Sequence, residues 1–202
     1  MKELVFATHN RHKAIEIQNI LKGTYRVLTL EELNYHDPVP EDRDTLVGNA
    51  SRKAWYVYDL FKKDCFADDT GLEVDCLNGA PGVYSARYAE LTSDKLVNET
   101  ASEANIRKLL KQMGGRYDRK ARFRTVVCLI LNREEYHFEG IVEGKIIEEK
   151  RGGEGFGYDP VFIPDGYTTT FAEMSLDEKN LISHRARAVK DLAEFLESNS
   201  IQ

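Results

Sequence analysis

Two long stretches rich in apolar and β-branched residues, 122–131 and 136–149, follow one another with only residues 132–135 between them. Such a pair predicts a β-hairpin of two long antiparallel strands. On either side of the hairpin, short apolar runs alternate with helical patterns, as in α/β proteins. The expected fold is therefore a single mixed α/β domain over residues 1–202, with long antiparallel strands in its central sheet.

The remaining elements follow from apolar periodicity and from helix-capping residues. Strands are expected at 2–7, 25–30, 65–67 and 161–163, and 72–76 could pair locally. Helices are expected at 11–22, 44–62, 92–113 and 183–198. Gly23 should end the first helix, while Asp44 and Ser183 should cap the second and the last. The proline-containing segment 34–43 is expected to be a loop.

The composition excludes several classes of protein. Charged residues make up 31% and hydrophobic residues 42%, which is typical of a globular chain rather than a disordered one. The longest apolar run has six residues, 126–131, whereas a membrane-spanning helix needs about 20. The first ten residues do not form a secretory signal, so a cytoplasmic location is expected.

The net charge argues against one class of ligand, and the cysteine pattern argues against disulfides and a zinc motif. A net charge of −6 disfavours nucleic-acid binding, and the basic segment 116–124 is better explained as the solvated start of a strand. The three cysteines, Cys65, Cys76 and Cys128, are odd in number and spaced by 11 and 52 residues, which gives neither a disulfide framework nor a zinc pattern, so buried free thiols are expected.

Polar residues follow the first expected strand and begin the first helix: Thr8, His9, Asn10, Arg11, His12 and Lys13. Backbone N–H groups at such a helix start form a ready anion site, and Lys13 lies one turn into the helix. The local pattern alone slightly favours a simple helix cap with a surface lysine, because it is not a Walker loop.

Two adjacent carboxylates, Asp68 and Asp69, come directly after the apolar run 65–67 and are followed by Thr70 and Gly71. Neighbouring residues of a strand point to opposite faces, so one could face a ligand while the other holds the loop. Carboxylate oxygens are ligands that Mg²⁺ prefers. A polar Asp-x-Gly turn explains the same residues equally well.

Two later segments favour ligand contact. Four glycines lie within residues 152–157, and Phe156 between them is suited to stacking on a flat base. Lys179, His184 and Arg185 are expected near the start of the last helix, where cations oppose the helix dipole and therefore suggest a bound partner. Lys53 lies on the second expected helix and matters only if that helix borders the site.

Six stretches, in order, resemble the non-canonical purine nucleoside triphosphate pyrophosphatases, also called the inosine triphosphate pyrophosphatase family. They are Thr8-x-Asn10-x-x-Lys13, Asn49-Ala50-x-x-Lys53-Ala54, Ala67-Asp68-Asp69-Thr70-Gly71-Leu72, Gly79-Ala80-Pro81-Gly82-Val83-Tyr84-Ser85-Ala86-Arg87, Gly155-Phe156-Gly157-Tyr158-Asp159-Pro160 and Ser183-His184-Arg185. The resemblance implies an elongated α/β fold with two lobes around a deep cleft, and a homodimer. It implies hydrolysis of ITP, dITP or XTP to the monophosphate and pyrophosphate, with Mg²⁺.

The resemblance also implies roles for individual residues. Residues 8–13 would hold the triphosphate, and Asp69 would be the general base and a metal ligand, with Glu41 as a second ligand. Thr70 would touch the substrate. The base pocket would comprise Phe156, Gly157, Tyr158, Asp159, Lys179, His184 and Arg185.

One position departs from the family pattern, and the assignment of the second metal ligand is left open. Gly48 stands where the family often has a glutamate, so any metal role of that position is lost. Asp42 or Asp44 could replace Glu41, because their loop carries no sharp motif.

Two other functions remain open at this stage. A Maf-like nucleotide pyrophosphatase would favour pyrimidine or modified nucleotides, against which Phe156 and the 183–185 segment argue. A nucleotide-sensing module would bind a triphosphate without turnover, against which Lys13, Asp68 and Asp69 argue.

Overall fold

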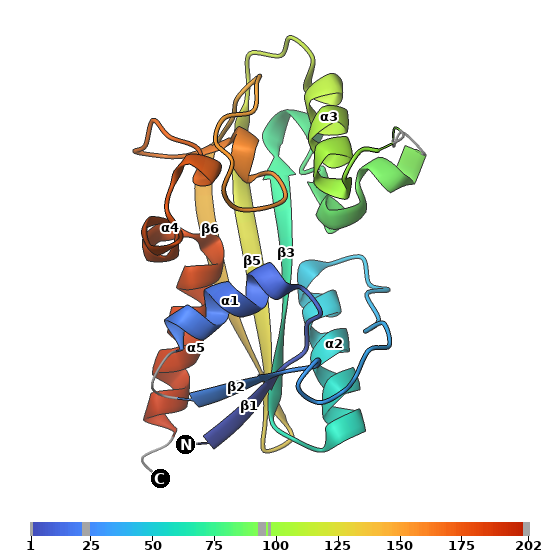
Figure 1. Cartoon of the computed structure of the whole chain (residues 1–202), viewed down its shortest axis with the longest axis vertical. Helices are drawn as coiled ribbons and strands as arrows, with labels where there is room; N and C mark the ends of the chain where they lie inside the picture. The colour runs from blue at the N-terminus through green and yellow to red at the C-terminus, as the bar shows by residue number, and fades with distance from the viewer. Residues whose placement is uncertain (1, 22–24, 93–95, 97, 200–202) are drawn as a thin grey trace. The chain divides into compact units, whose positions relative to one another are not determined.

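We describe the protein from a computed structural model, which covers all residues except 1, 22–24, 93–95, 97 and 200–202. In this described part, seven strands form one sheet in the order β2-β1-β3-β5-β6-β7, with β4 pairing to β3 (Figure 1). The strands are β1 (Lys2–Phe6), β2 (Tyr25–Thr29), β3 (Cys65–Val74), β4 (Pro81–Gly82), β5 (Lys120–Leu131), β6 (Glu134–Ile146) and β7 (Phe162–Pro164). The predicted mixed α/β fold class is confirmed.

The predicted hairpin of long strands is present as β5 and β6. Its turn is shorter than expected and consists of Asn132 and Arg133 alone, with φ of 53° and 70°. Positive φ at both central residues is what a type I′ turn requires, and that turn matches the twist of paired strands. Strand β6 therefore starts two residues earlier than predicted, and it ends at Ile146 rather than at 149.

Strand β3 differs most from the prediction. The sequence suggested a strand at 65–67 followed by a turn, but β3 continues without a break to Val74. It pairs in parallel with β1 at its start and antiparallel with β4 at its end. Gly71 is not a turn residue: a Cβ there would lie 2.7 Å from the backbone oxygen of Gly82, so glycine permits the close approach of β4.

Five α-helices are present in the described residues: α1 (Arg11–Ile20), α2 (Leu46–Phe61), α3 (Ala101–Met113), α4 (Leu176–Ile182) and α5 (His184–Ser198). Ser183 caps α5 as predicted, but Thr45 rather than Asp44 caps α2. Helix α3 starts later than predicted because Thr100 and Glu103 form a capping box. Helix α4 was not predicted. Gly23, predicted to end the first helix, lies outside the described residues. So does part of the segment 92–100, which was predicted as the first turns of the third helix.

The chain divides into two compact units, each with its own apolar core. The first comprises residues 1–69, 125–140 and 183–202, and the second residues 70–124 and 141–182. In the first, side chains of α1 and α5, such as Ile17 and Leu192, pack against β1 and β3 residues such as Phe6 and Phe66. In the second, α3 packs with β5–β7 and the adjoining loops through residues such as Leu109, Phe123 and Phe162. The single-domain assignment and the cleft stay predictions.

Helix α5 begins directly against strand β6. A Cβ at Gly140 would lie 1.9 Å from the backbone oxygen of His184 and 2.7 Å from the backbone nitrogen of Ala188. Both neighbours are helix backbone and cannot rotate away, so glycine is required for this packing.

We therefore expect Gly140→Ala to lower the free energy of unfolding by about 1–3 kcal/mol or more, as overpacking does. Urea titration followed by circular dichroism measures this. Gly115→Ala is the matched control, because nothing lies within 4 Å of a Cβ at that position. Equal stability of the two variants would contradict the close packing of α5 on β6.

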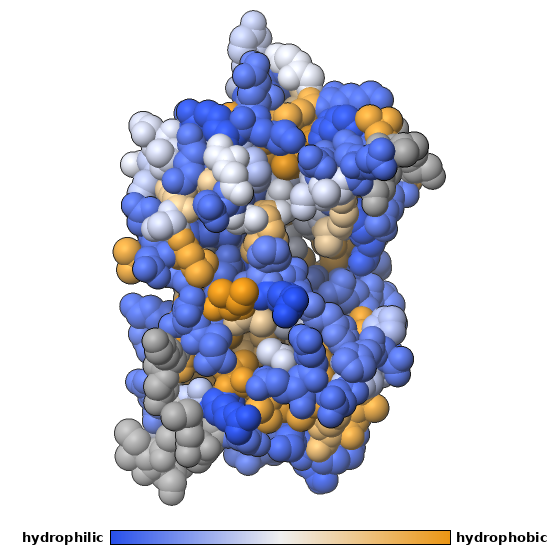
Figure 2. Space-filling model, viewed as in Figure 1, coloured by the Kyte–Doolittle hydropathy of each residue, from blue (hydrophilic) through white to orange (hydrophobic). Residues whose placement is uncertain are grey.

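On the face shown in Figure 2, hydrophilic residues predominate and apolar residues are scattered among them in small groups. In the part of the chain that the structure describes, no helix combines the length and the hydropathy needed to cross a bilayer.

Candidate functional site

The two adjacent carboxylates of β3 point in opposite directions, as strand geometry requires. Asp68 contacts Lys13 of α1 and Arg185 of α5, whereas Asp69 contacts Asn49 and Lys53 of α2. All of these residues belong to the first compact unit. The continuous strand thus distributes two neighbouring acids between two different sets of partners.

Asp68 is part of a buried network of charges. Its Oδ1 accepts a hydrogen bond from Lys13 Nζ at 2.9 Å, and its Oδ2 accepts one from Arg185 Nε at 3.4 Å. Arg185 also donates through Nη1 to Glu16. Asp68 and Arg185 are each 1% exposed. Two acids and two bases therefore neutralise one another in the interior, which is the condition under which buried charges are tolerated.

The network shifts the ionisation of its members. Burial alone would raise the pKa of Asp68, but Lys13 and Arg185 outweigh it and hold that pKa below its ordinary value. Burial lowers the pKa of Lys13, and Asp68 only partly opposes this effect. Asp68 is thus a fixed anion that orients the two cations.

The start of α1 is capped by its own sequence. The Asn10 side chain accepts hydrogen bonds from the backbone N–H groups of His12 and Lys13, at 3.0 and 3.2 Å. The predicted helix cap is therefore correct, but Lys13 is not the surface lysine expected with it, because its side chain is 13% exposed and pairs with Asp68. The side chains of His9, Arg11 and His12 are exposed.

Asp69 forms a second group with residues of α2 and the preceding loop. Its Oδ2 accepts from Asn49 Nδ2 at 3.1 Å, and its Oδ1 accepts from Lys53 Nζ at 3.3 Å. Lys53 Nζ also contacts Glu41 Oε1 at 2.5 Å. Lys53 is only 4% exposed, so it is not the solvated lysine that an isolated position on a helix suggested.

This second group also shifts its pKa values. Burial raises the pKa of Asp69, and Lys53 only partly offsets it. Burial would lower the pKa of Lys53, but Asp69 and Glu41 outweigh it and raise that pKa above its ordinary value. Lys53 is thus a buried cation between two carboxylates.

Of the three acids considered as a second metal ligand, Glu41, Asp42 and Asp44, Glu41 is the one that joins the Asp69 group. Its side chain is 36% exposed and contacts Lys53, whereas Asp42 forms ion pairs with Arg43 and Arg52. Asp44 is exposed.

Gly48 lets this loop pass close to α2. A Cβ at position 48 would lie 2.9 Å from Arg43 Cβ and 2.9 Å from Thr45 Oγ1. The Arg43 backbone N–H donates to Asn49 Oδ1 at 2.9 Å, so Asn49 links the loop to Asp69.

The glycine-rich segment and α4 form a third group, in the second compact unit. Asp159 Oδ2 accepts hydrogen bonds from the Phe156 backbone N–H and from Lys179 Nζ, both at 2.8 Å. The Lys179 ammonium lies 4.9 Å from the centre of the Phe156 ring, and the ring is half-buried. Gly155 has φ +77°, and a Cβ there would lie 2.3 Å from Asp159 Oδ2. The glycine-rich segment therefore folds back so that its backbone packs against the Asp159 carboxylate.

The structure brings most of the predicted residues into these groups. Tyr158 is buried and donates to the Ser85 backbone oxygen at 3.0 Å, which makes it part of the framework. Thr70 follows Asp69 in β3 and is half-buried. Lys179 was expected near the start of the last helix but lies in α4. His184 is buried in the first turn of α5.

Two partners were missed by the sequence analysis. Asn49 lies one helical turn before Lys53 on α2, and Glu16 lies three residues after Lys13 on α1. The i, i+4 and i, i+3 spacings place each pair on one helix face, and this signal was available from the sequence.

Together, the fold and the contacts define a mixed α/β protein in which carboxylates and lysines lie in groups, whose oxygen atoms could hold a cation and whose ammonium groups could hold an anion. The model of the Ham1 family matches residues 4–195, and the chain belongs to this family. The resemblance found in the sequence is thereby confirmed.

Curated and solved relatives extend over nearly the whole chain. A dITP/XTP pyrophosphatase of Porphyromonas gingivalis is 50% identical over 197 residues, which cover 97% of this chain and 98% of that protein. The solved structure of the Staphylococcus aureus Ham1 protein has a TM-score of 0.84 and 39% identity, covering 98% of this chain and 100% of that one. A HAM1 protein from Coxiella burnetii has a TM-score of 0.85 and 35% identity, with the same coverage.

Proposed function

We propose that this protein hydrolyses the non-canonical purine nucleoside triphosphates dITP, XTP and ITP to the monophosphate and pyrophosphate, and so cleanses the nucleotide pool. The observation that carries the proposal is the half-identical, full-length relative from P. gingivalis, which is named a dITP/XTP pyrophosphatase. The Asp69 group and the Phe156 group supply side chains suited to the phosphates and to the base.

The donor atoms around Asp69 suit Mg²⁺. Asp69 and Glu41 both present carboxylate oxygens to the same ammonium of Lys53, so the two acids lie within reach of one ion. Hard oxygen ligands are what Mg²⁺ prefers. When bound there, Mg²⁺ would neutralise phosphate charge and make a nearby water more acidic.

The side chains around Asp69 have distinct roles in the proposed reaction. A water oxygen attacks the α-phosphorus, the bond from that phosphorus to the bridging oxygen breaks, and pyrophosphate leaves. The Asp69 carboxylate accepts the proton of the attacking water. Asn49 fixes the orientation of Asp69, while the ammonium groups of Lys53 and Lys13 stabilise negative charge on the phosphates.

The segment 8–13 is proposed to hold the triphosphate mainly through side chains. Asn10 already occupies the backbone N–H groups of His12 and Lys13. The exposed His9, Arg11 and His12 therefore supply contacts at the edge of the phosphate site.

The Phe156 group is proposed to bind the base. Lys179 covers one face of the Phe156 ring, so the base would stack on the opposite face. His184 and Arg185 are proposed to donate to the O6 atom of hypoxanthine or xanthine, which adenine lacks. Such contacts would discriminate against adenine, because a buried hydrogen-bond donor left without an acceptor costs about 1–3 kcal/mol.

We expect Phe156→Ala to weaken substrate binding with little effect on kcat. Base stacking on an aromatic side chain contributes about 1–3 kcal/mol, which corresponds to a KM increase of about 5- to 150-fold. Steady-state kinetics with ITP measure both parameters. Tyr167→Ala, which removes an exposed aromatic ring elsewhere in the same unit, is the control and should behave as wild type. An unchanged KM for Phe156→Ala would remove this residue from the base site.

A nucleotide panel tests the proposed function as a whole. Pyrophosphate release is measured with dITP, XTP, ITP, ATP, GTP and a pyrimidine triphosphate, with Mg²⁺ and after its removal by a chelator. We expect turnover of the first three nucleotides only, and loss of turnover without the ion. Equal rates with ATP and ITP contradict the base site, a pyrimidine preference supports a Maf-like enzyme, and ITP binding without turnover supports a sensing module.

We further propose a homodimer that acts in the cytoplasm without binding nucleic acid. Light scattering on the purified protein tests the dimer, and a monomer mass across micromolar concentrations would contradict it. Cell fractionation tests the location, and a mobility-shift assay tests nucleic-acid binding.

A further inference from the structure

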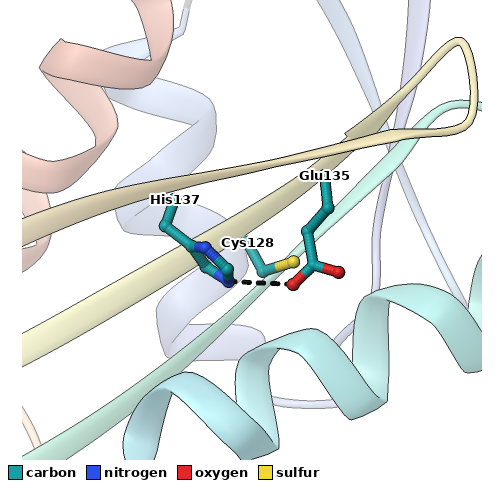
Figure 3. A group of neighbouring side chains, drawn as sticks. All are labelled: Cys128, Glu135 and His137. Atoms are coloured by element: carbon teal, nitrogen blue, oxygen red, sulfur yellow. Dashed lines mark ion pairs between the residues drawn. The ribbon is translucent and has the colours of Figure 1, made fainter.

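Three side chains with metal-binding atoms gather on the hairpin of β5 and β6. The Cys128 Sγ, one carboxylate oxygen of Glu135 and a ring nitrogen of His137 all lie within 4.8 Å of one another. Figure 3 shows the three side chains directed toward one another from the two strands. A regular ladder around the two-residue turn puts residue 128 opposite residue 137, with residue 135 on the same face as 137.

The neighbours of these residues orient them toward one point. Glu135 Oε1 lies 3.0 Å from His137 Nε2, and the Ser51 hydroxyl lies 2.5 Å from that oxygen and 2.9 Å from that nitrogen. The other carboxylate oxygen of Glu135 accepts from Trp55 Nε1 at 2.5 Å. Such contacts, made by groups that would not themselves bind the ion, orient metal ligands in known sites.

We propose that Cys128, Glu135 and His137 form a binding site for a zinc ion, separate from the proposed magnesium site. Thiolate, imidazole and carboxylate together are typical zinc ligands, and three protein ligands leave one position for water. Zinc bonds of about 2.0–2.3 Å place the ligand atoms roughly 3.3–3.8 Å apart, so small side-chain movements suffice.

The donor set also selects the metal. Mg²⁺ prefers oxygen ligands, whereas a cysteine sulfur favours Zn²⁺. Formation of the sulfur–zinc bond releases the thiol proton to solvent, while the carboxylate and the neutral imidazole bind through lone pairs. Cys128 is buried and its partners on β6 are partly exposed, so an ion can reach the site from solvent.

The protein contains its own reporter of this site. Trp55 is the single tryptophan of the chain, and its indole donates to the proposed ligand Glu135. Titration of the metal-free protein with Zn²⁺, in excess Mg²⁺, should change the tryptophan fluorescence with a stoichiometry of one ion per chain. Co²⁺ used as a spectroscopic probe should give a thiolate-to-metal charge-transfer band in the near ultraviolet.

Variants connect the signals to individual ligands. Cys128→Ser should abolish the Co²⁺ band, and His137→Ala, a surface change, should weaken Zn²⁺ binding at least about tenfold. Cys76→Ser and His36→Ala are matched controls and should bind as wild type. The proposal is overturned if the wild-type protein shows no thiolate band, or if both ligand variants bind Zn²⁺ with unchanged affinity. These readouts do not depend on nucleotide turnover, so the outcome is separate from that of the proposed function.

Discussion

Asp69→Asn is expected to lower kcat for pyrophosphate release from ITP by about 10²–10⁴-fold, the range for removal of a general base. The amide cannot accept the proton of the attacking water and is a weaker metal ligand than a carboxylate. Its oxygen can still accept the hydrogen bond that Asn49 now donates to Asp69 Oδ2. The fold should therefore be preserved while turnover is lost.

The measurement is steady-state kinetics, with urea unfolding of the same sample as a check of stability. Turnover near the wild-type rate would show that Asp69 is not the base. If the variant is largely unfolded under the assay conditions, the lost turnover would reflect a structural role of Asp69 instead.

The same substitution one residue earlier should have a different effect. We expect Asp68→Asn to lower the free energy of unfolding by about 3–5 kcal/mol, because removal of one partner leaves a buried charge without compensation. Lys13 and Arg185 would lose the anion that lies 2.9 and 3.4 Å from them, which leaves Glu16 paired with Arg185 and removes the carboxylate paired with Lys13.

Urea titrations of Asp68→Asn and Asp69→Asn test this difference, since each variant is the control for the other. If the two variants are equally stable, the Asp68 network does not stabilise the folded state as argued. Replacement of Asp68 by glutamate retains the charge and should recover part of the lost stability.

Much of the fold could be predicted because local signals agree with the tertiary structure. The apolar runs predicted β1, β2 and the hairpin within a few residues, and Ser183 marked the start of α5. The course of β3 could not be predicted, since it depends on the approach of β4 to Gly71 and not on residues near in sequence. Thr45 and Asp44 are both good helix caps, and only the structure distinguishes them.

The candidate site was predicted in its membership better than in its contacts. Asp69, Lys53 and Glu41 do come together, but the sequence alone gave no reason to prefer Glu41 to Asp42. Arg185 and Asp68 are 117 positions apart in the sequence, and a periodic pattern cannot predict a contact between residues so far apart. The hairpin of Cys128 and His137 was predicted, but with its bend at 132–135, and therefore without the register that makes these two residues neighbours.

The alternation of Asp68 and Asp69 along β3 makes this segment sensitive to length as well as to composition. One residue inserted between Cys65 and Asp68 would slip the register, so that Asp68 would take the place of Asp69 and Asp69 the place of Thr70. The acid now held between Lys13 and Arg185 would face α2, the proposed base would turn to the opposite face of the strand, and the two cations would lose their anion. A one-residue insertion at this point should therefore be more damaging than most substitutions, although it removes no side chain at all.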